Sequence, residues 1–401
     1  MAEANPASIL DAIRRVGPLA RVALADRLGL SAATVTTVTA ELIEAGLVRE
    51  EAPPPGPGTA RRGRPRVLLS ADPGAMTLLG AKIADRHVRV VVTDFCGGVL
   101  GQAIQPFAVP ADAAAVEAAL AEAVDAALDQ AGTGLAEIAA LGVGLPGFVD
   151  QASGTIHWSP AFAAPRTGLA EQFSRRFGCP VFLDNDANLA TLAELRFGFG
   201  RGQSDFLVVT IENGVGLGIV LGGALFRGAR GLGAEFGHTK VRQDGALCRC
   251  GQRGCLEAYV ADYALVREAE VLQPDGAADP MAALYARAAA GDPMVRQLLA
   301  RAGRLFGLGL ANLVNIFDPP LVILSGERMR FDHLFTPEVV AEMRAHMIHT
   351  NRPAPEIKVH RWGDLLWARG AAVLAMDGVL RRPAPPRALM QGPKALALTD
   401  R

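Results

Sequence analysis

Hydrophobic residues in the first fifty positions recur at the spacing of short amphipathic helices. The spacing predicts a first helix over residues 8–16 and a second over residues 21–28. Ser31 is a good N-cap for a third helix, which we expect to end at Gly46. The side chains that the second helix turns inward are predicted to be Val22, Ala25 and Leu28.

Two short β-rich runs follow the third predicted helix. Residues 47–49 and 67–69 have the composition of paired strands, and residues 52–59 between them are rich in proline and glycine. Three helices and a two-stranded wing are typical of a winged helix-turn-helix domain, whose third helix enters the DNA major groove. A small helical dimerisation module is the alternative.

An arginine-rich arm lies within this wing. Its arginines are interleaved with glycine and proline, so the segment can form neither a helix nor a central strand. An extended basic arm suits the narrow, electronegative minor groove of A·T-rich DNA. The arm residues that we expect to contact DNA are Arg61, Arg62, Arg64 and Arg66.

The outward face of the third helix offers only small side chains for reading bases. Alanine and threonine can touch thymine methyl groups or phosphates, but they cannot make bidentate contacts to guanine. Residues 1–70 carry nine arginines against seven acidic residues, and so weak a field favours binding as a dimer with two arms. The DNA contacts predicted at this helix are Ser31, Ala32, Ala33, Thr34, Thr36 and Thr37.

From Met76 onward the pattern changes to short β-rich runs that alternate with helical segments. A strand–turn–strand arrangement occurs twice, which indicates two related α/β lobes around a cleft. An alanine-rich helix is predicted over residues 113–131. The predicted strands are residues 78–83, 88–93, 99–103, 138–143, 181–183, 206–211, 216–221 and 224–226.

Composition indicates a soluble globular protein. The chain has 401 residues, is 50% hydrophobic and carries a formal net charge of −1, so no overall field demands a polyanionic partner. No signal peptide and no membrane-spanning run is evident, and low cysteine use fits a reducing cytoplasm. Outside one cluster, Cys96 and Cys179 are expected to be small buried hydrophobic residues.

One histidine and three cysteines form the strongest chemical signal in the chain. Cys248, Cys250 and Cys255 follow His238 closely, and structural zinc takes four nitrogen or sulfur ligands of this kind. A disulfide or unpaired thiols are the alternative, which the short spacing and the absence of an oxidising compartment disfavour. We therefore predict one structural zinc ion per chain.

From its N-terminus to about residue 380 the chain resembles the ROK family of repressors, open reading frames and sugar kinases. The resemblance implies an actin-like, two-lobed sugar-kinase fold, of class α/β, preceded by the winged helix-turn-helix domain, and assembly as a homodimer or homotetramer. The motifs that carry it, in order along the chain, are residues 142–147, residues 184–188, residues 231–238, the cysteine cluster, and residues 307–319 with 321–326.

The domain boundaries that follow are a proposal from sequence alone. The tail after the last domain is rich in proline and alanine and is expected to be disordered. The predicted parts are a DNA-binding domain over residues 1–72, a first lobe over 76–187 completed by a helix at about 363–381, a second lobe with the zinc site over 188–362, and the tail over 383–401.

Phosphoryl transfer requires loops that hold phosphates, and this sequence lacks both. The resemblance makes Asp186 the counterpart of the catalytic base of ROK kinases. The first phosphate turn, which is Asp-x-Gly-Gly-Thr-like in those kinases, reads Lys-Ile-Ala-Asp-Arg over residues 82–86. The second, Gly-Thr-Gly, reads Glu-Asn-Gly over residues 212–214. Because close approach to phosphate needs glycine and no added negative charge, we expect no kinase activity and a vestigial Asp186.

A pocket for a sugar-like effector remains. One departure from the family is Ala161-Phe162, where sugar-binding members have an asparagine after the proline; a modified or less polar sugar, or the loss of sugar binding, would follow. By resemblance, the residues that bind hydroxyl groups are Asn185, Asp186, Glu235, His238 and Glu257.

The combined features predict a repressor of carbohydrate uptake or catabolism genes. Its partners are double-stranded DNA with an A·T-rich operator and a small sugar or sugar derivative, with no membrane. The alternatives are a sugar kinase with an accessory DNA-binding head, and a regulator controlled by a protein partner.

Overall fold

The chain folds into two compact units. The first contains residues 1–197 and 367–401, and the second contains residues 198–366. The structure is a computed structural model that describes residues 6–52, 67–84, 86–107, 113–162, 165–272, 279–326, 334, 336–348, 353–360, 363 and 365–381. None of the helices in these ranges is both long enough and apolar enough to cross a bilayer.

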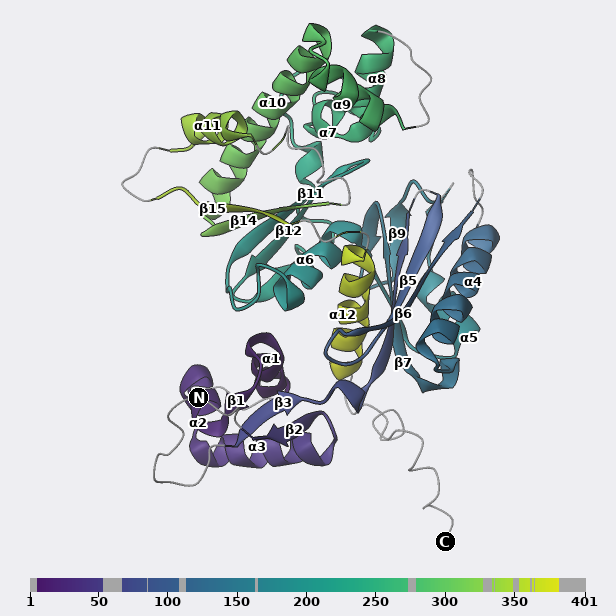
Figure 1. Ribbon diagram of the computed structural model, residues 1–401, viewed down its shortest axis with the longest axis vertical. Coiled ribbons are helices and arrows are strands. Elements are labelled where there is room, and N and C mark those ends of the chain that lie inside the picture. The colour runs from purple at the N-terminus through teal and green to yellow at the C-terminus, as the bar shows by residue number, and fades with distance from the viewer. Residues whose placement is uncertain are drawn as a thin grey trace. The chain divides into compact units, whose positions relative to one another are not determined.

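The first unit begins with a small head of three helices and three short strands (Figure 1). The strands form an antiparallel sheet in the order β1-β3-β2, so the wing has one strand more than the sequence pattern predicts. The elements are α1 (Pro6–Val16), β1 (Leu19–Ala20), α2 (Arg21–Leu28), α3 (Ala32–Glu44), β2 (Val48–Glu51) and β3 (Leu68–Ala71). This arrangement confirms the predicted winged helix-turn-helix.

The local signals in the head act as expected, with one exception. The Ser31 hydroxyl caps α3 by accepting a hydrogen bond from the Thr34 backbone N–H at 3.1 Å. On α2, however, Val22 is 70% exposed and Leu24 is fully buried. The inward face assigned to α2 was therefore wrong at Val22, because two turns of helix fit more than one apolar register.

The rest of the first unit is a mixed sheet covered by helices. Its strand order is β10-β7-β4-β5-β6, in which β10, β7 and β4 are parallel and the last two pairs are antiparallel. Helix α4 packs against β5 and β6, as an alanine-rich amphipathic helix should. The strands and helices are β4 (Thr77–Ile83), β5 (His87–Thr93), β6 (Val99–Pro106), α4 (Ala113–Ala131), β7 (Ile138–Leu145), β8 (Phe148–Asp150), β9 (Thr155–Trp158), α5 (Leu169–Phe177), β10 (Val181–Asn185), α6 (Asp186–Phe197) and α12 (Leu366–Leu380), with single 3-10 turns at Pro73–Ala75 and Leu135–Glu137.

Helix α12, the last one in the described part of the chain, approaches this sheet with backbone against backbone. A Cβ atom added to Gly80 on β4 would lie 1.9 Å from the Ala368 carbonyl oxygen, and one added to Gly142 on β7 would lie 1.9 Å from that of Ala371. Glycine at these two strand positions is what permits so short a separation. In Figure 1, α12 (yellow) accordingly lies beside these strands although it comes last in the sequence.

The two cysteines outside the cluster differ from each other. Cys179 is buried, as predicted, and burial raises the pKa of its thiol to about 11. Cys96 is exposed, and its Sγ donates to the Ala71 carbonyl oxygen at 3.6 Å. The expectation of a buried Cys96 was wrong, because the residue lies in the turn between β5 and β6 and not within a strand.

The second unit is another mixed sheet with helices. Its strand order is β13-β12-β11-β14-β15, in which the β11, β14 and β15 pairings are parallel. The long helix α10 packs against α7, α8, α9 and α11 (Figure 1). The elements are β11 (Phe206–Ile211), β12 (Val215–Leu221), β13 (Ala224–Phe226), the 3-10 turn η3 (Phe236–His238), α7 (Glu257–Val260), α8 (Asp262–Leu272), α9 (Pro280–Ala289), α10 (Pro293–Phe317), β14 (Leu321–Ser325), α11 (Pro337–His346) and β15 (Glu356–His360).

Candidate metal, ligand and DNA sites

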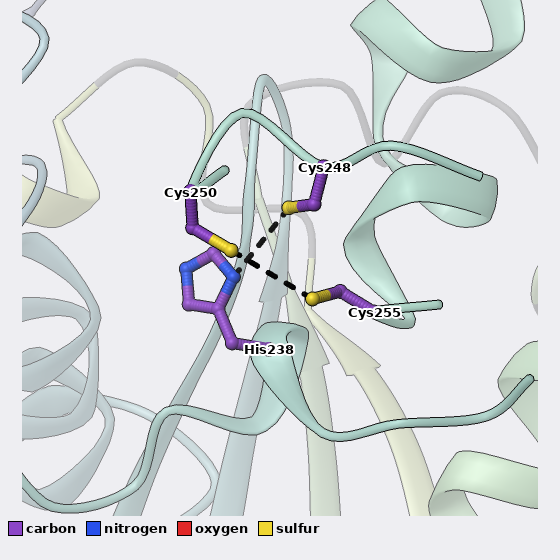
Figure 2. Close-up of side chains that lie close together, drawn as sticks. All are labelled: His238, Cys248, Cys250 and Cys255. Atoms are coloured by element: carbon purple, nitrogen blue, oxygen red, sulfur yellow. Dashed lines mark hydrogen bonds between the residues drawn. The ribbon is translucent and has the colours of Figure 1, made fainter. Parts of the chain in front are cut away.

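Four side chains of the second unit converge on one point, as Figure 2 shows. His238 ends the short turn η3, and Cys248, Cys250 and Cys255 lie on the loop between η3 and α7. All four ligand atoms lie within 4.8 Å of one another. The structure thus brings together the complete set that the sequence predicted as a metal site.

The loop is held in this shape by its own backbone. Isolated β-bridges pair Lys240 with Cys255 and Leu247 with Arg253. The Cys248 N–H donates to the Gln252 carbonyl at 2.8 Å, which brings the first two cysteines into a tight turn. At Gly254 the φ angle is +77°, and a Cβ there would lie 1.8 Å from the Arg242 carbonyl oxygen. Glycine is therefore required at that position to close the loop.

The distances fit a tetrahedral zinc ion. Zinc bonds of about 2.3 Å to sulfur and about 2.0 Å to nitrogen place two sulfurs roughly 3.8 Å apart, and a sulfur and a nitrogen roughly 3.6 Å apart. Cys250 Sγ and Cys255 Sγ are separated by 3.7 Å, and Cys248 Sγ lies 3.6 Å from His238 Nδ1. These two separations match those of a tetrahedral site, and the four residues supply its full number of ligands.

The protonation of the cluster depends on its surroundings. Burial raises the pKa of the Cys248 thiol to about 12, so a metal ion has to displace a proton there. For Cys250 burial acts in the same direction, but hydrogen bonds from the Gln252 N–H and from the other two thiols outweigh it and lower the pKa. The Lys240 ammonium donates to Cys255 Sγ at 2.9 Å.

Glu257 connects the metal loop to residues 212–214, where the sequence predicts that a phosphate turn has been lost. Its carboxylate is 8% exposed and accepts a hydrogen bond from the Val215 N–H at 3.3 Å, directly after Gly214. Cys248 Sγ and the Tyr263 hydroxyl lie 3.6 and 3.5 Å from its other oxygen. A carboxylate thus accepts the backbone N–H that directly follows Gly214. By contrast, Glu235 is exposed.

In the first unit, Asn185 and Asp186 lie where β10 ends and α6 begins. The Asn185 side-chain amide donates to the Gly147 carbonyl at 2.7 Å, and its oxygen accepts from the Ala187 N–H at 2.8 Å. Asp186 Oδ1 accepts from the same N–H at 2.9 Å. Both side chains are thereby aimed by the N-terminus of α6. These two residues belong to the first unit, whereas Glu235, His238 and Glu257 belong to the second.

The segment that begins at Lys82, where the sequence predicts that the other phosphate turn has been lost, contains a buried cation. Lys82 at the end of β4 is 5% exposed, and its Nζ lies 3.6 Å from the centre of the Trp367 ring on α12. This cation–π contact stabilises the buried charge inside the unit. Asp85, the other substitution noted in the sequence, lies outside the described residues.

Ala161 and Phe162, which depart from the sequence of sugar-binding family members, are buried. The two residues are 5% and 7% exposed and pack in the core of the first unit. The guanidinium of Arg166 lies 5.1 Å from the Phe162 ring centre. The Phe162 ring therefore serves packing, so the sequence change removes a polar group without exposing an aromatic one.

The candidate DNA-reading face of α3 presents methyl groups. The Thr36 and Thr37 hydroxyls donate to the carbonyls of Ala32 and Ala33, at 2.7 and 3.2 Å. Because these hydroxyls are engaged within the helix, the exposed part of each side chain is apolar. Ser31 is engaged in the cap, and Thr34 is partly buried. The four arginines of the predicted arm, Arg61, Arg62, Arg64 and Arg66, lie outside the described residues.

Sequence reasoning missed three residues that support these sites. Arg21 holds α2 to α3 and β2, because its Nε donates to the Thr39 hydroxyl at 3.0 Å and its Nη2 to Glu50 at 2.8 Å. Lys240 and Tyr263 support the metal loop. Only Lys240, two residues after His238, had a sequence position that could have indicated its role.

Comparison with known proteins places these sites in a family. A ROK family model matches residues 87–378, and a MarR family model matches residues 4–56. The chain is 29% identical to the xylose repressor of Caldicellulosiruptor bescii, over 79% of this chain and 81% of that protein. It is 28% identical to the DNA-binding transcriptional dual regulator NagC of Escherichia coli, over 84% of this chain and 83% of that protein.

Solved structures have the same fold. A ROK family transcriptional regulator, a homologue of the E. coli MLC protein, covers 97% of this chain and 100% of its own, with a TM-score of 0.77 and 24% identity. A ROK glucokinase from Streptomyces griseus, solved with glucose and AMPPNP, covers 75% of this chain and 100% of its own, with a TM-score of 0.65 and 30% identity. The predicted fold class is confirmed, and the chain belongs to the ROK family.

Proposed function

We propose that this protein is a transcriptional repressor that responds to a sugar. The observation that carries the proposal is the fusion of a MarR-type winged-helix head with a ROK body, in one chain that aligns with repressors over most of its length. The regulated genes then serve carbohydrate uptake or catabolism. Its DNA partner implies a cytoplasmic location.

The residues proposed to bind the effector carry groups that can form hydrogen bonds with hydroxyls. Asn185 and Asp186 at the start of α6, with Glu235, His238 and Glu257, supply the amide, carboxylate and imidazole groups that a polyol requires. The similar repressors are named for xylose and for N-acetylglucosamine, so the effector class is a small sugar or a sugar derivative.

The proposed zinc ion is structural. With four protein ligands it keeps no open position for water or substrate. Its role would be to hold His238 and Glu257 in place, with one imidazole nitrogen on the metal and the other toward the ligand. Lys240 and Tyr263 support that arrangement from outside the ligand set.

DNA binding is proposed to combine two contacts from each head. The methyl groups of Thr36 and Thr37 would touch thymines in the major groove, and the arginine arm would enter an A·T-rich minor groove. The weak charge of the head favours a homodimer or homotetramer on a two-fold operator.

Kinase activity is the alternative function, and the similarity to a glucokinase supports considering it. Two features argue against it. Lys82 stands where the first phosphate turn needs an aspartate and packs on Trp367, and Glu212 adds a negative charge to the second turn. Phosphoryl transfer depends on both turns.

Two assays test the proposal. DNA fragments from upstream of the protein's own gene and its neighbours are titrated in a gel-shift assay at about 0.15 M salt, with and without D-xylose, D-glucose and N-acetylglucosamine. We expect specific binding that one sugar weakens. If no fragment is bound above a random-sequence control, the repressor proposal fails. A coupled assay of ATP turnover with the same sugars should give no rate above a sugar-free blank, and turnover would favour the kinase.

A further inference from the structure

A cluster of charged residues joins the head to the body of the first unit. Arg196, near the end of α6, pairs with Asp11 on α1 of the head and with Asp377 on α12, the latter at 3.3 Å. Arg14 and Arg15 on α1 complete the cluster, with Arg14 3.8 Å from Asp377 and Arg15 2.6 Å from Asp11. One guanidinium therefore bridges the head and the last helix.

The cluster is enclosed and carries excess positive charge. The side chains of Arg14 and Arg196 are only 7% and 8% exposed, and that of Asp377 is 16% exposed. Three arginines share two aspartates, Asp11 being the second. Burial and the neighbouring Arg196 charge lower the pKa of Arg14 to about 10. The arrangement therefore contains one guanidinium that is poorly compensated, and a small movement of any of the three helices changes the pairing.

The turn between β5 and β6 also contacts this cluster of charged residues. The Phe95 ring lies 5.1 Å from the guanidinium carbon of Arg14, and the Phe95 N–H donates to the Pro73 carbonyl at 3.1 Å. On the other side, Arg369 of α12 donates to the Gly97 carbonyl at 3.3 Å and lies over the Phe197 ring at 4.4 Å. The end of α6 and the start of α12 therefore lie against the turn that contacts the head.

The opposite end of α6 carries the proposed ligand-binding residues. Asp186 is its first residue, and the side chains of Asn185 and Asp186 both accept the Ala187 N–H. A ligand hydroxyl that donates to either side chain therefore binds a group that also caps this helix. The twelve residues of α6 span roughly 18 Å, at about 1.5 Å each.

Helix α6 is suited to transmit such a change as a rigid body. Residues 187–196 are all buried, and a Cβ added to Gly370 on α12 would lie 1.9 Å from the Leu189 carbonyl oxygen. A helix enclosed in this way cannot bend into free space, so a shift at its start moves its end.

We propose that α6 is the allosteric connection of this repressor, and that Arg196 converts a ligand contact at Asn185 and Asp186 into a changed attachment of the DNA-binding head. The inference rests on the proposed function. It differs from a simple anchoring role, because an anchor would hold the head in the same way whether or not the effector site is occupied.

Coupling between two binding sites acts in both directions. If a ligand at the start of α6 affects the head, then DNA bound to the head must affect the start of α6, and this can be tested before the sugar is identified. Hydrogen exchange of backbone amides in peptides covering residues 185–191 is measured for the full chain, free and bound to a duplex that it selects from a random library. In the wild-type protein we expect bound DNA to change this exchange rate by about 5-fold or more, within the range of typical couplings. An identical rate with and without DNA overturns the inference.

Variants at Arg196 and a control variant distinguish a loss of coupling between the head and α6 from a general loss of folding. Arg196→Gln leaves two arginines with two aspartates, and Arg196→Lys keeps the charge but cannot bridge two carboxylates with one planar group. The matched control is Arg287→Gln, which breaks an ion pair of 2.8 Å with Asp292 in the second unit. We expect all three to bind DNA, with the exchange response abolished in Arg196→Gln, reduced in Arg196→Lys and unchanged in Arg287→Gln. A full response in a folded Arg196→Gln or Arg196→Lys protein overturns the inference.

A second arm distinguishes the two proposals. The sugar that weakens operator binding in the wild type, found among D-xylose, D-glucose and N-acetylglucosamine, is titrated against each variant. Retained sugar binding with loss of release in the Arg196 variants supports the inference. Release that is undiminished in those variants overturns it while the repressor function stands. If the wild type selects no duplex at all, the proposed function fails, and the inference with it.

Discussion

Arg14 and Arg196 lie in one cluster, and their replacement by methionine should have opposite effects on stability. For Arg14, burial outweighs the attraction of the aspartates and lowers the pKa to about 10. That fall of roughly 2.5 pH units corresponds to about 3 kcal/mol against the charged form. The cation–π contact with Phe95 offsets about 1 kcal/mol of it. Arg14→Met should therefore stabilise the first unit by roughly 1–2 kcal/mol.

At neutral pH the charge of Arg14 destabilises the first unit, whereas the charge of Arg196 stabilises it. Arg14 is charged in the folded and unfolded states at pH 7, so its penalty is fully present below about pH 10 and lessens only above it. For Arg196, burial lowers the pKa, but the charges of Asp377 and Asp11 outweigh burial and raise it overall. Its stabilising contribution is therefore fully present at pH 7, and Arg196→Met should destabilise the unit by about 1–3 kcal/mol.

Urea unfolding followed by circular dichroism measures both effects at pH 7. Because two units can unfold separately, each transition is fitted by itself, and only that of the first unit should move. By thermal melting, Arg14→Met should raise the midpoint by roughly 2–8 °C and Arg196→Met should lower it by roughly 2–12 °C. If Arg14→Met instead lowers the midpoint, the assignment of Arg14 as the poorly compensated charge is refuted.

Three further predictions concern the other sites. Cys250→Ser should lower bound zinc well below one equivalent per chain in metal analysis. In the wild-type protein, bound zinc should be lost as the pH falls, because protons compete with the metal most strongly at Cys248, whose thiol has a raised pKa. Gly142→Ala should destabilise the first unit by about 1–3 kcal/mol in urea unfolding, because its Cβ would collide with the backbone of α12, whereas Gly134→Ala, with nothing within 4 Å, should be near neutral. Thr37→Ser, which removes the methyl group, should weaken operator binding about 5-fold in a gel shift, and Thr37→Val should not; equal losses would contradict methyl readout.

The sequence was most informative where the determinants are local. The bounds of α2 and α4 agree with the periodic pattern to the residue, and Ser31 caps α3 as its type and position suggest. The metal cluster could also be predicted, because its four ligands lie within eighteen positions and few other structures use such a set.

Long-range contacts could not be predicted in this way. Arg196 is separated by 185 positions from Asp11 and by 181 from Asp377, and no periodic pattern relates them. The cation–π pair of Lys82 and Trp367 is similarly remote in sequence, so Lys82 was noted only as a departure from a motif. Such contacts depend on how the sheet and α12 come together, which a single sequence without covarying relatives does not specify.

The position of α12 has a consequence for synthesis on the ribosome. This helix fits into glycine-lined depressions on β4 and β7, yet it is translated only after the whole second unit. The second unit is continuous in sequence and can fold while the chain is still growing. One apolar face of the sheet in the first unit therefore stays uncovered until the chain has emerged from the ribosome to about residue 380. A nascent chain truncated before α12 would expose that face, and we expect such fragments to aggregate or to be degraded before they can occupy DNA.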